Sequence, residues 1–271
     1  MSRTLPKAQQ IEIAGDPDAG ALLFPGPAVP RACVVVSHGG GNDHLYGLWY
    51  AIERLVGAGF AVLTGHLAGH GKGGQDLFSL ANAQRRLDAL AREAGQRFDR
   101  LFLLGQSLGG ALALDSLARG QSWQAAVSVS APHNLQVGTD AWLETAALFR
   151  PTTWRALRYA GPYEALPAFK AFKRGRFPVR VTPGTNYLRE FEMAVAQMDL
   201  LARLSDKVSS PLLLVHGARD GVIPPFQASE LSATSGATAT LYIAPRCHHL
   251  EPLLERSTLD AIVEFLDGSI D

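Results

Sequence analysis

The stretch that decides the fold reads Leu101-Phe-Leu-Leu-Gly105-Gln-Ser107-Leu-Gly109-Gly. An apolar run typical of a buried strand leads into the pattern G-x-S-x-G, and helix-forming residues follow at once. A strand, this pattern and a helix in that order are typical of a nucleophile elbow. Glycines two positions either side of the serine let strand and helix approach closely. The sequence therefore predicts Ser107 as a nucleophile, and the alternative is a glycine-rich turn that happens to contain serine.

Two later strand ends supply an acid and a base. Asp220 follows the apolar run 211–215, and His248 and His249 follow the run 240–244. Loops at the carboxyl ends of strands are where open α/β sheets place their chemistry. A base must take the serine proton, and a carboxylate fixes the tautomer of that base. Asp220 is therefore the predicted acid of a Ser-His-Asp triad.

Either neighbouring histidine could be the base. We favour His249, because the apolar Leu250 that follows it can anchor the next helix, as is usual after a triad histidine. His248 remains the alternative base, since spacing alone does not separate the two.

An oxyanion hole needs two convergent backbone N–H groups. One would come from Leu108, directly after the nucleophile, and the other from Gly39 or Gly40, which follow the apolar run 32–36. Glycine lets the backbone reach a substrate carbonyl without an intervening side chain. Gly39 and Gln106, which adjoin the predicted donors and nucleophile, are assigned to substrate binding.

These motifs resemble α/β-hydrolases of the monoacylglycerol lipase and lysophospholipase type, over roughly residues 30–130 and 205–267. The resemblance implies an α/β-hydrolase fold, with a mostly parallel doubly wound sheet and a helical cap insertion, and it assigns the second oxyanion donor to Gly40. Two positions depart from the family pattern. The loop 66–73 lacks the aspartate and serine usual there, and Gln106 replaces the usual histidine of the elbow.

The walk along the chain supports this organisation. Short apolar runs alternate with helical patterns, as in a doubly wound sheet, and the runs 11–13, 21–24 and 32–36 suggest an antiparallel start. The interval after the run 125–129 is too long for an ordinary crossover connection. We therefore expect a first core part over 1–131, a helical cap over 132–208 and a second core part over 209–271.

The predicted cap is unusual in charge. From Arg150 to Arg180 it carries eight basic residues against one acidic residue, interleaved with aromatic side chains. This composition predicts a lid that attracts an anionic or amphiphilic ester or makes weak membrane-surface contact. The alternative is a solvated helical surface whose aromatic side chains pack on the core.

Composition narrows the functional classes. The 271 residues are 47% hydrophobic and carry a formal net charge of zero, which gives no reason to expect a nucleic-acid partner. Cys33 and Cys247 are expected to be reduced thiols of a cytoplasmic protein, and Cys247 is an alternative nucleophile. The N-terminal stretch lacks the apolar region of a signal peptide. No cofactor or metal is expected, and the oligomeric state stays open.

The expected activity is hydrolysis of carboxylic esters. The same triad also supports perhydrolase activity and the cleavage of thioester, peptide or carbon–carbon bonds, which are the alternatives. Substrates would be small-molecule esters resembling monoacylglycerols or lysophospholipids. Serine at the elbow argues against dehalogenase and epoxide hydrolase chemistry, which uses aspartate there. A catalytically silent protein that binds ligands in the same pocket is the alternative from another class.

Overall fold

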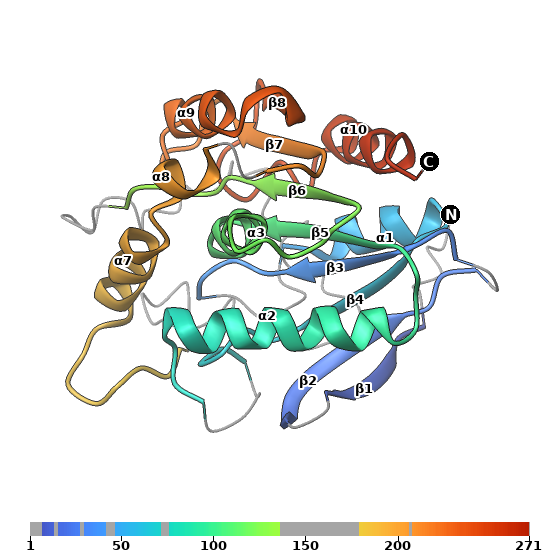
Figure 1. Ribbon diagram of the computed structural model, residues 1–271, viewed down its shortest axis with the longest axis horizontal. Helices are drawn as coiled ribbons and strands as arrows, with labels where there is room; N and C mark the ends of the chain where they lie inside the picture. Colours follow the sequence, from blue (N-terminus) through green and yellow to red (C-terminus); the bar gives the residue numbers. More distant parts are fainter. Residues whose placement is uncertain are drawn as a thin grey trace.

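The structure is a computed structural model that describes residues 7–13, 16–27, 30–41, 47–71, 76–135, 179–205 and 208–270, without the side chains of 16–20. Its centre is one eight-stranded sheet (Figure 1). The strands are β1 (Gln9–Ile13), β2 (Asp16–Phe24), β3 (Cys33–Ser37), β4 (Ala61–Gly65), β5 (Leu101–Gln106), β6 (Ala125–Val129), β7 (Leu212–Gly217) and β8 (Ala239–Ala244).

The sheet has the order β1-β2-β4-β3-β5-β6-β7-β8, and six of its strands, from β4 to β8 in that order, run parallel. The antiparallel start predicted from the sequence is right for β1 and β2 and wrong for β3. After β3 the chain crosses over through a helix and returns as β4, which lies between β3 and β2. β2 therefore pairs with β4 and not with β3. All other parallel strands likewise need crossover connections. Their carboxyl ends therefore lie at one edge of the sheet.

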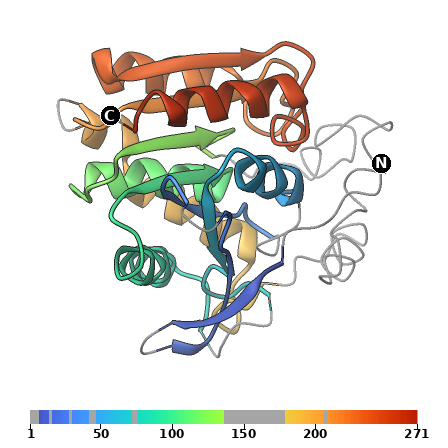
Figure 2. The same ribbon diagram turned by 90° about the vertical axis from the view of Figure 1, so that its right-hand side faces the viewer.

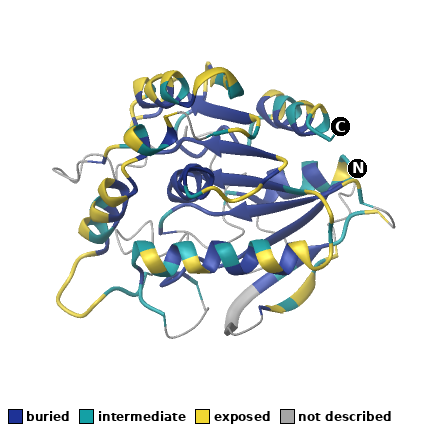
Figure 3. Cartoon of the chain, in the orientation of Figure 1, coloured by how far each residue is buried: buried dark blue, intermediate teal, exposed yellow. Residues whose placement is uncertain are grey.

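Helices cover both faces of the sheet (Figure 2). One core cluster packs the sheet against α2 and α3, and a second packs the opposite face against α1 and α10. Figure 3 shows the central strands buried throughout, as their continuous apolar runs require. The helices are α1 (Trp49–Gly57), α2 (Leu80–Gly95), α3 (Leu108–Ala118), α7 (Tyr187–Met198), α8 (Leu200–Leu204), α9 (Phe226–Ser235) and α10 (Arg256–Asp267), with a 3-10 turn at Gly236–Thr238.

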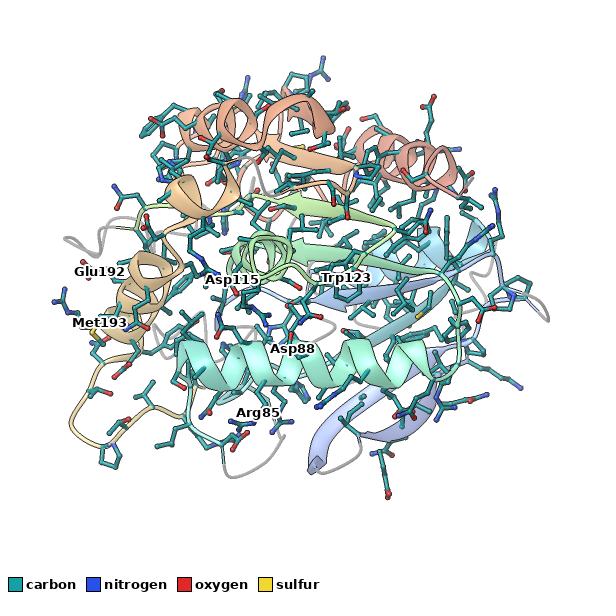
Figure 4. The ribbon with its side chains drawn as sticks, viewed as in Figure 1. Arg85, Asp88, Asp115, Trp123, Glu192 and Met193 are labelled. Carbon is teal, nitrogen blue, oxygen red and sulfur yellow. The ribbon has the colours of Figure 1, made fainter. Side chains whose placement is uncertain are left out.

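A buried carboxylate joins three of these helices. Asp115 on α3 is fully buried and accepts hydrogen bonds from Gln84 on α2, from Arg119, and from Arg203 on α8, at 2.8–2.9 Å. Arg119 also reaches Asp88 on α2, and Figure 4 labels both carboxylates in the space between α2 and α3. The network ties α3, whose N-cap is Ser107, to α8, which lies where the chain returns to the core.

Part of the predicted cap lies within the described chain. α7 buries one apolar face, including Tyr187, Phe191 and Val195, and the helix lies beside α3. The aromatic side chains of the basic stretch, and all of its basic residues except Arg180, lie outside the described residues. Within the described part of the chain, no helix combines the length and apolar character needed to cross a membrane.

Candidate active site

The strand-to-helix turn at Ser107 has the backbone of a sharp elbow. Ser107 has φ 54° and ψ −116°, a conformation that costs a non-glycine residue of order 1–3 kcal/mol and that clusters at functional sites. Glycine is required on both sides. A Cβ on Gly105 would collide with the carbonyl of Gly109, and a Cβ on Gly109 would collide with the carbonyl of Ser37. The glycines of the motif thus let β5, α3 and β3 approach one another.

The structure brings Ser107, His249 and Asp220 into one hydrogen-bonded line. Nε2 of His249 lies 3.0 Å from Oγ of Ser107, and Nδ1 of His249 lies 2.8 Å from Oδ2 of Asp220. Because the carboxylate only accepts, Nδ1 carries the proton and Nε2 is free to accept from the serine hydroxyl. All three residues are buried. The arrangement can therefore transfer a proton from the serine to the imidazole.

Asp220 is held in its charged form. Burial alone would raise its pKa, but the electrostatic interaction with His249 and hydrogen bonds from His216 and His249 hold the pKa of this carboxyl well below its usual range. Its other oxygen accepts the backbone N–H groups of Val222 and Ile223, at 2.9 and 2.8 Å. A carboxylate so fixed keeps His249 in one tautomer and orientation.

His216 is a contact that the sequence reasoning did not single out. It lies near the end of β7, and its Nε2 lies 3.2 Å from Asp220 Oδ2 and 2.9 Å from the carbonyl oxygen of Ile223. The sequence does place His216 four residues before Asp220, but this spacing does not show whether the imidazole ring turns toward the carboxylate.

His248 points elsewhere. Its backbone N–H and its ring Nδ1 lie 2.8 and 3.0 Å from Oε2 of the buried Glu251, so the ring belongs to its own turn. Leu250 is buried as expected, but the next helix begins only at Arg256, after further turns. The structure thus brings His249, and not His248, to Ser107.

The predicted oxyanion donors lie at two element ends. The N–H of Leu108 belongs to the first turn of α3, where N–H groups have no acceptor within the helix. Gly40 lies in the turn after β3, beside Tyr187, whose hydroxyl would collide with any Cβ at this position. A side chain at 40 would therefore require the Tyr187 hydroxyl to shift.

The two residues assigned to substrate binding differ in their surroundings. The carbonyl of Gly39 accepts a hydrogen bond from the His38 ring. Gln106 is buried at the end of β5, and its register with Val129 places it on the sheet face of α1 and α10. Among the described residues, its Nε2 has no hydrogen-bond partner. No group of three His, Cys, Asp or Glu side chains in the described chain is arranged to bind a metal.

Comparison with known proteins places the chain among hydrolases. The model of the family described as serine aminopeptidase, S33, matches residues 28–256. A search of curated proteins finds no significant match.

Several solved structures share the fold. A soluble variant of the monoglyceride lipase of Saccharomyces cerevisiae, in complex with a substrate analog, superimposes with a TM-score of 0.70 at 16% identity, covering 100% of this chain and 96% of that one. The monoacylglycerol lipase of Paleococcus ferrophilus gives 0.65 at 24% identity, over 93% and 99% of the two chains. A meta-cleavage product hydrolase of Pseudomonas fluorescens gives 0.66 at 18%, over 96% and 98%.

Proposed function

The chain belongs to the serine aminopeptidase S33 family of α/β hydrolases, and from this premise we propose that it hydrolyses carboxylic esters through Ser107, His249 and Asp220. The observation that carries the proposal is the hydrogen-bonded line from Asp220 to the strained elbow serine. The ester class is supported by the shared fold of two enzymes named as monoacylglycerol lipases. Small-molecule esters of that kind are the proposed substrates.

The proposed mechanism uses these groups in the following order. Oγ of Ser107 attacks the acyl carbon while Nε2 of His249 takes its proton, and Asp220 stabilises the resulting imidazolium. The N–H groups of Leu108 and Gly40 hold the negative oxygen of the tetrahedral intermediate. The imidazolium then protonates the leaving alcohol, and water, activated by His249, releases the acid from the acyl-enzyme.

The cap is part of the proposal. We assign 132–208 to a cap inserted between the core parts 1–131 and 209–271, and the packing of α7 beside α3 supports this. Such a cap would form the wall of the acyl pocket nearest the nucleophile.

Peptide hydrolysis is the second candidate, because the matching family is named for an aminopeptidase. A panel of p-nitrophenyl esters of graded chain length, monoacylglycerols, acyl thioesters and aminoacyl p-nitroanilides separates the classes. We expect turnover of the esters and little or none of the anilides. The opposite order would move the assignment to a peptidase.

Substitution of the nucleophile tests the mechanism directly. Ser107→Ala should keep the fold and lower kcat for p-nitrophenyl esters by about 10⁴-fold or more, and Asp220→Asn should cost a comparable factor. A fluorophosphonate probe should label the native protein and not Ser107→Ala. The exposed Ser122→Ala is the matched control and should be labelled normally. A native protein that resists the probe and turns over no substrate would be a binding protein instead.

A further inference from the structure

Two buried histidines flank the proposed oxyanion donor Gly40, and the mechanism above gives neither of them a role. His38 directly follows the last residue of β3, and His70 lies in the loop after β4. Both rings are fully buried and lie in edge-to-face contact, with centroids 5.1 Å apart.

His38 acts on the peptide unit that contains the donor. Its Nδ1 lies 2.7 Å from the carbonyl oxygen of Gly39, and its Nε2 accepts the N–H of Leu67 at 2.9 Å. The carbonyl of Gly39 and the N–H of Gly40 belong to one planar trans peptide, so they point in opposite directions. Holding that carbonyl toward the His38 ring therefore turns the Gly40 N–H away from it. Polarisation of the carbonyl also strengthens the N–H as a donor.

His70 acts on the next peptide unit. Its Nε2 accepts the N–H of Gly41 at 3.0 Å, and its Nδ1 lies 2.9 Å from the carbonyl oxygen of Ala68. The planes on both sides of Gly40 are thus fixed by side chains anchored to one loop. Gly40 itself has no side chain that could restrict its backbone, so this restraint comes from outside the turn.

The hydrogen bonds of His38 and His70 require both rings to be neutral. In each ring one nitrogen faces a carbonyl and must carry the proton, while the other accepts an N–H and must lack one. Burial lowers the pKa of His38 to about 4. Burial also lowers the pKa of His70 to about 3, aided first by the electrostatic interaction with His38 and then by the charge of Arg180. A positive charge would remove the acceptor on which each loop depends.

The loop that carries His70 is itself held by the chain returning from the proposed cap. The N–H of Arg180 donates to the carbonyl of Gly69, the N–H of Phe78 donates to the carbonyl of Arg180, and the Arg180 guanidinium reaches the carbonyl of Gly71. Tyr187 then packs edge-to-face on His70. The restraint on Gly40 therefore extends to described residues of the cap.

We propose that His38 and His70 are positioning residues that hold the Gly39–Gly41 turn so that the Gly40 N–H faces the substrate's acyl oxygen. The inference rests on the proposed function, because it assumes that Gly40 stabilises an oxyanion. It predicts a loss expressed in the transition state, since substrate in its ground state gains little from this donor.

Amide side chains can test each nitrogen separately. The amide of asparagine reaches about as far as Nδ1 of histidine, and that of glutamine about as far as Nε2. His70→Gln keeps an acceptor for Gly41, whereas His70→Asn keeps only the donor to Ala68. We expect kcat for a p-nitrophenyl ester to stay within about threefold of the native value in His70→Gln. In His70→Asn, kcat should fall about 10- to 100-fold with KM nearly unchanged. This loss is part of that expected when an oxyanion donor is removed altogether.

The order reverses at His38. There the bond to the donor peptide comes from Nδ1, so His38→Asn should retain kcat and His38→Gln should lose it. A purely structural role would make each loss follow thermal stability, not this reciprocal order. An alkyl boronic acid, whose adduct with Ser107 presents a tetrahedral oxygen, should lose affinity in parallel with kcat/KM.

Phe78→Leu is the matched control, because it removes an edge-to-face contact with His70 and leaves the Gly41 bond in place. It should lower thermal stability and leave kcat within about threefold. Equal kcat in the Gln and Asn variants at both positions, or an equal loss in Phe78→Leu, would overturn the proposal. Failure of the proposed function is distinct, because the native protein would then show neither turnover nor fluorophosphonate labelling.

Discussion

At the scale of single residues, the two adjacent histidines have different partners. His249 lies between Ser107 and Asp220, whereas His248 is bonded to Glu251 in the same turn. His249→Ala should therefore lower kcat by about 10⁴-fold, because a triad without its base retains little activity. His248→Ala should retain activity within a few-fold and lose some thermal stability. Initial rates with p-nitrophenyl esters decide the matter, and the reverse pattern would move the base to His248.

The sequence could indicate which residue types meet, because chain order and strand ends place Ser107, Asp220 and His249 at one edge of a parallel sheet. It could not show how His38, His70 and His216 are bonded. Those contacts join loops 29 residues apart, or depend on the turn of one ring, and no local pattern encodes them. Their only signal was that each precedes a glycine at a strand end or loop.

At the scale of elements, α3 depends on the carboxylate in its second half. Asp115 is fully buried and accepts hydrogen bonds from Gln84 on α2, from Arg203 on α8 and from Arg119 at the end of α3. Asp115→Ala leaves these donors without their acceptor, so we expect the free energy of unfolding to fall by about 3 kcal/mol. Urea denaturation measures this, with kcat per folded molecule retained because the elbow is untouched.

Asp267→Ala is the comparison for that loss. Asp267 pairs with Arg31 at 2.6 Å, but both side chains are more than a third exposed, and exposed pairs contribute about 0–1 kcal/mol. Equal effects of the two substitutions would show that the Asp115 network is no stronger than a surface pair.

Sequence periodicity predicted the alternation of strands and helices at this scale, and not the pairing of β2 with β4. Strand order depends on where each crossover returns, which is a property of the whole sheet. The predicted cap illustrates the same limit. The long interval after the run 125–129 is visible in the sequence. The packing of α7 beside α3 is not, because the apolar face of Tyr187, Phe191 and Val195 meets a core that only the folded chain provides.

At the scale of the whole molecule, the site exists because strands distant in sequence end together. The ends of β3, β5, β7 and β8 bring the turn at Gly40, the elbow at Ser107, Asp220 and His249 to one edge, where we propose that they act as oxyanion donor, nucleophile, acid and base. The buried polar groups at this edge are stabilised by hydrogen bonds to one another, so the free energy of unfolding depends on their protonation states.

Acid stability follows from this dependence. In the unfolded chain His38 and His70 have an ordinary pKa near 6.5, whereas in the folded chain their pKa values are about 4 and about 3. Between these values the unfolded state binds protons that the folded state excludes, so the free energy of unfolding falls as pH is lowered from about 6.5 toward 4. Two such protons give a slope of about 2.7 kcal/mol per pH unit near pH 5.

Replacing one of the two histidines should reduce by one the number of protons taken up on unfolding, and so lower the slope. Urea denaturation of His70→Gln between pH 6 and pH 5 should therefore give a dependence weaker than that of the native protein by about 1.4 kcal/mol per pH unit. Stability at pH 7 can differ between the two proteins for other reasons, so the slope, and not the absolute value, carries the test. An unchanged slope would mean that His70 takes up a proton in the folded state, which its acceptance of the Gly41 N–H forbids.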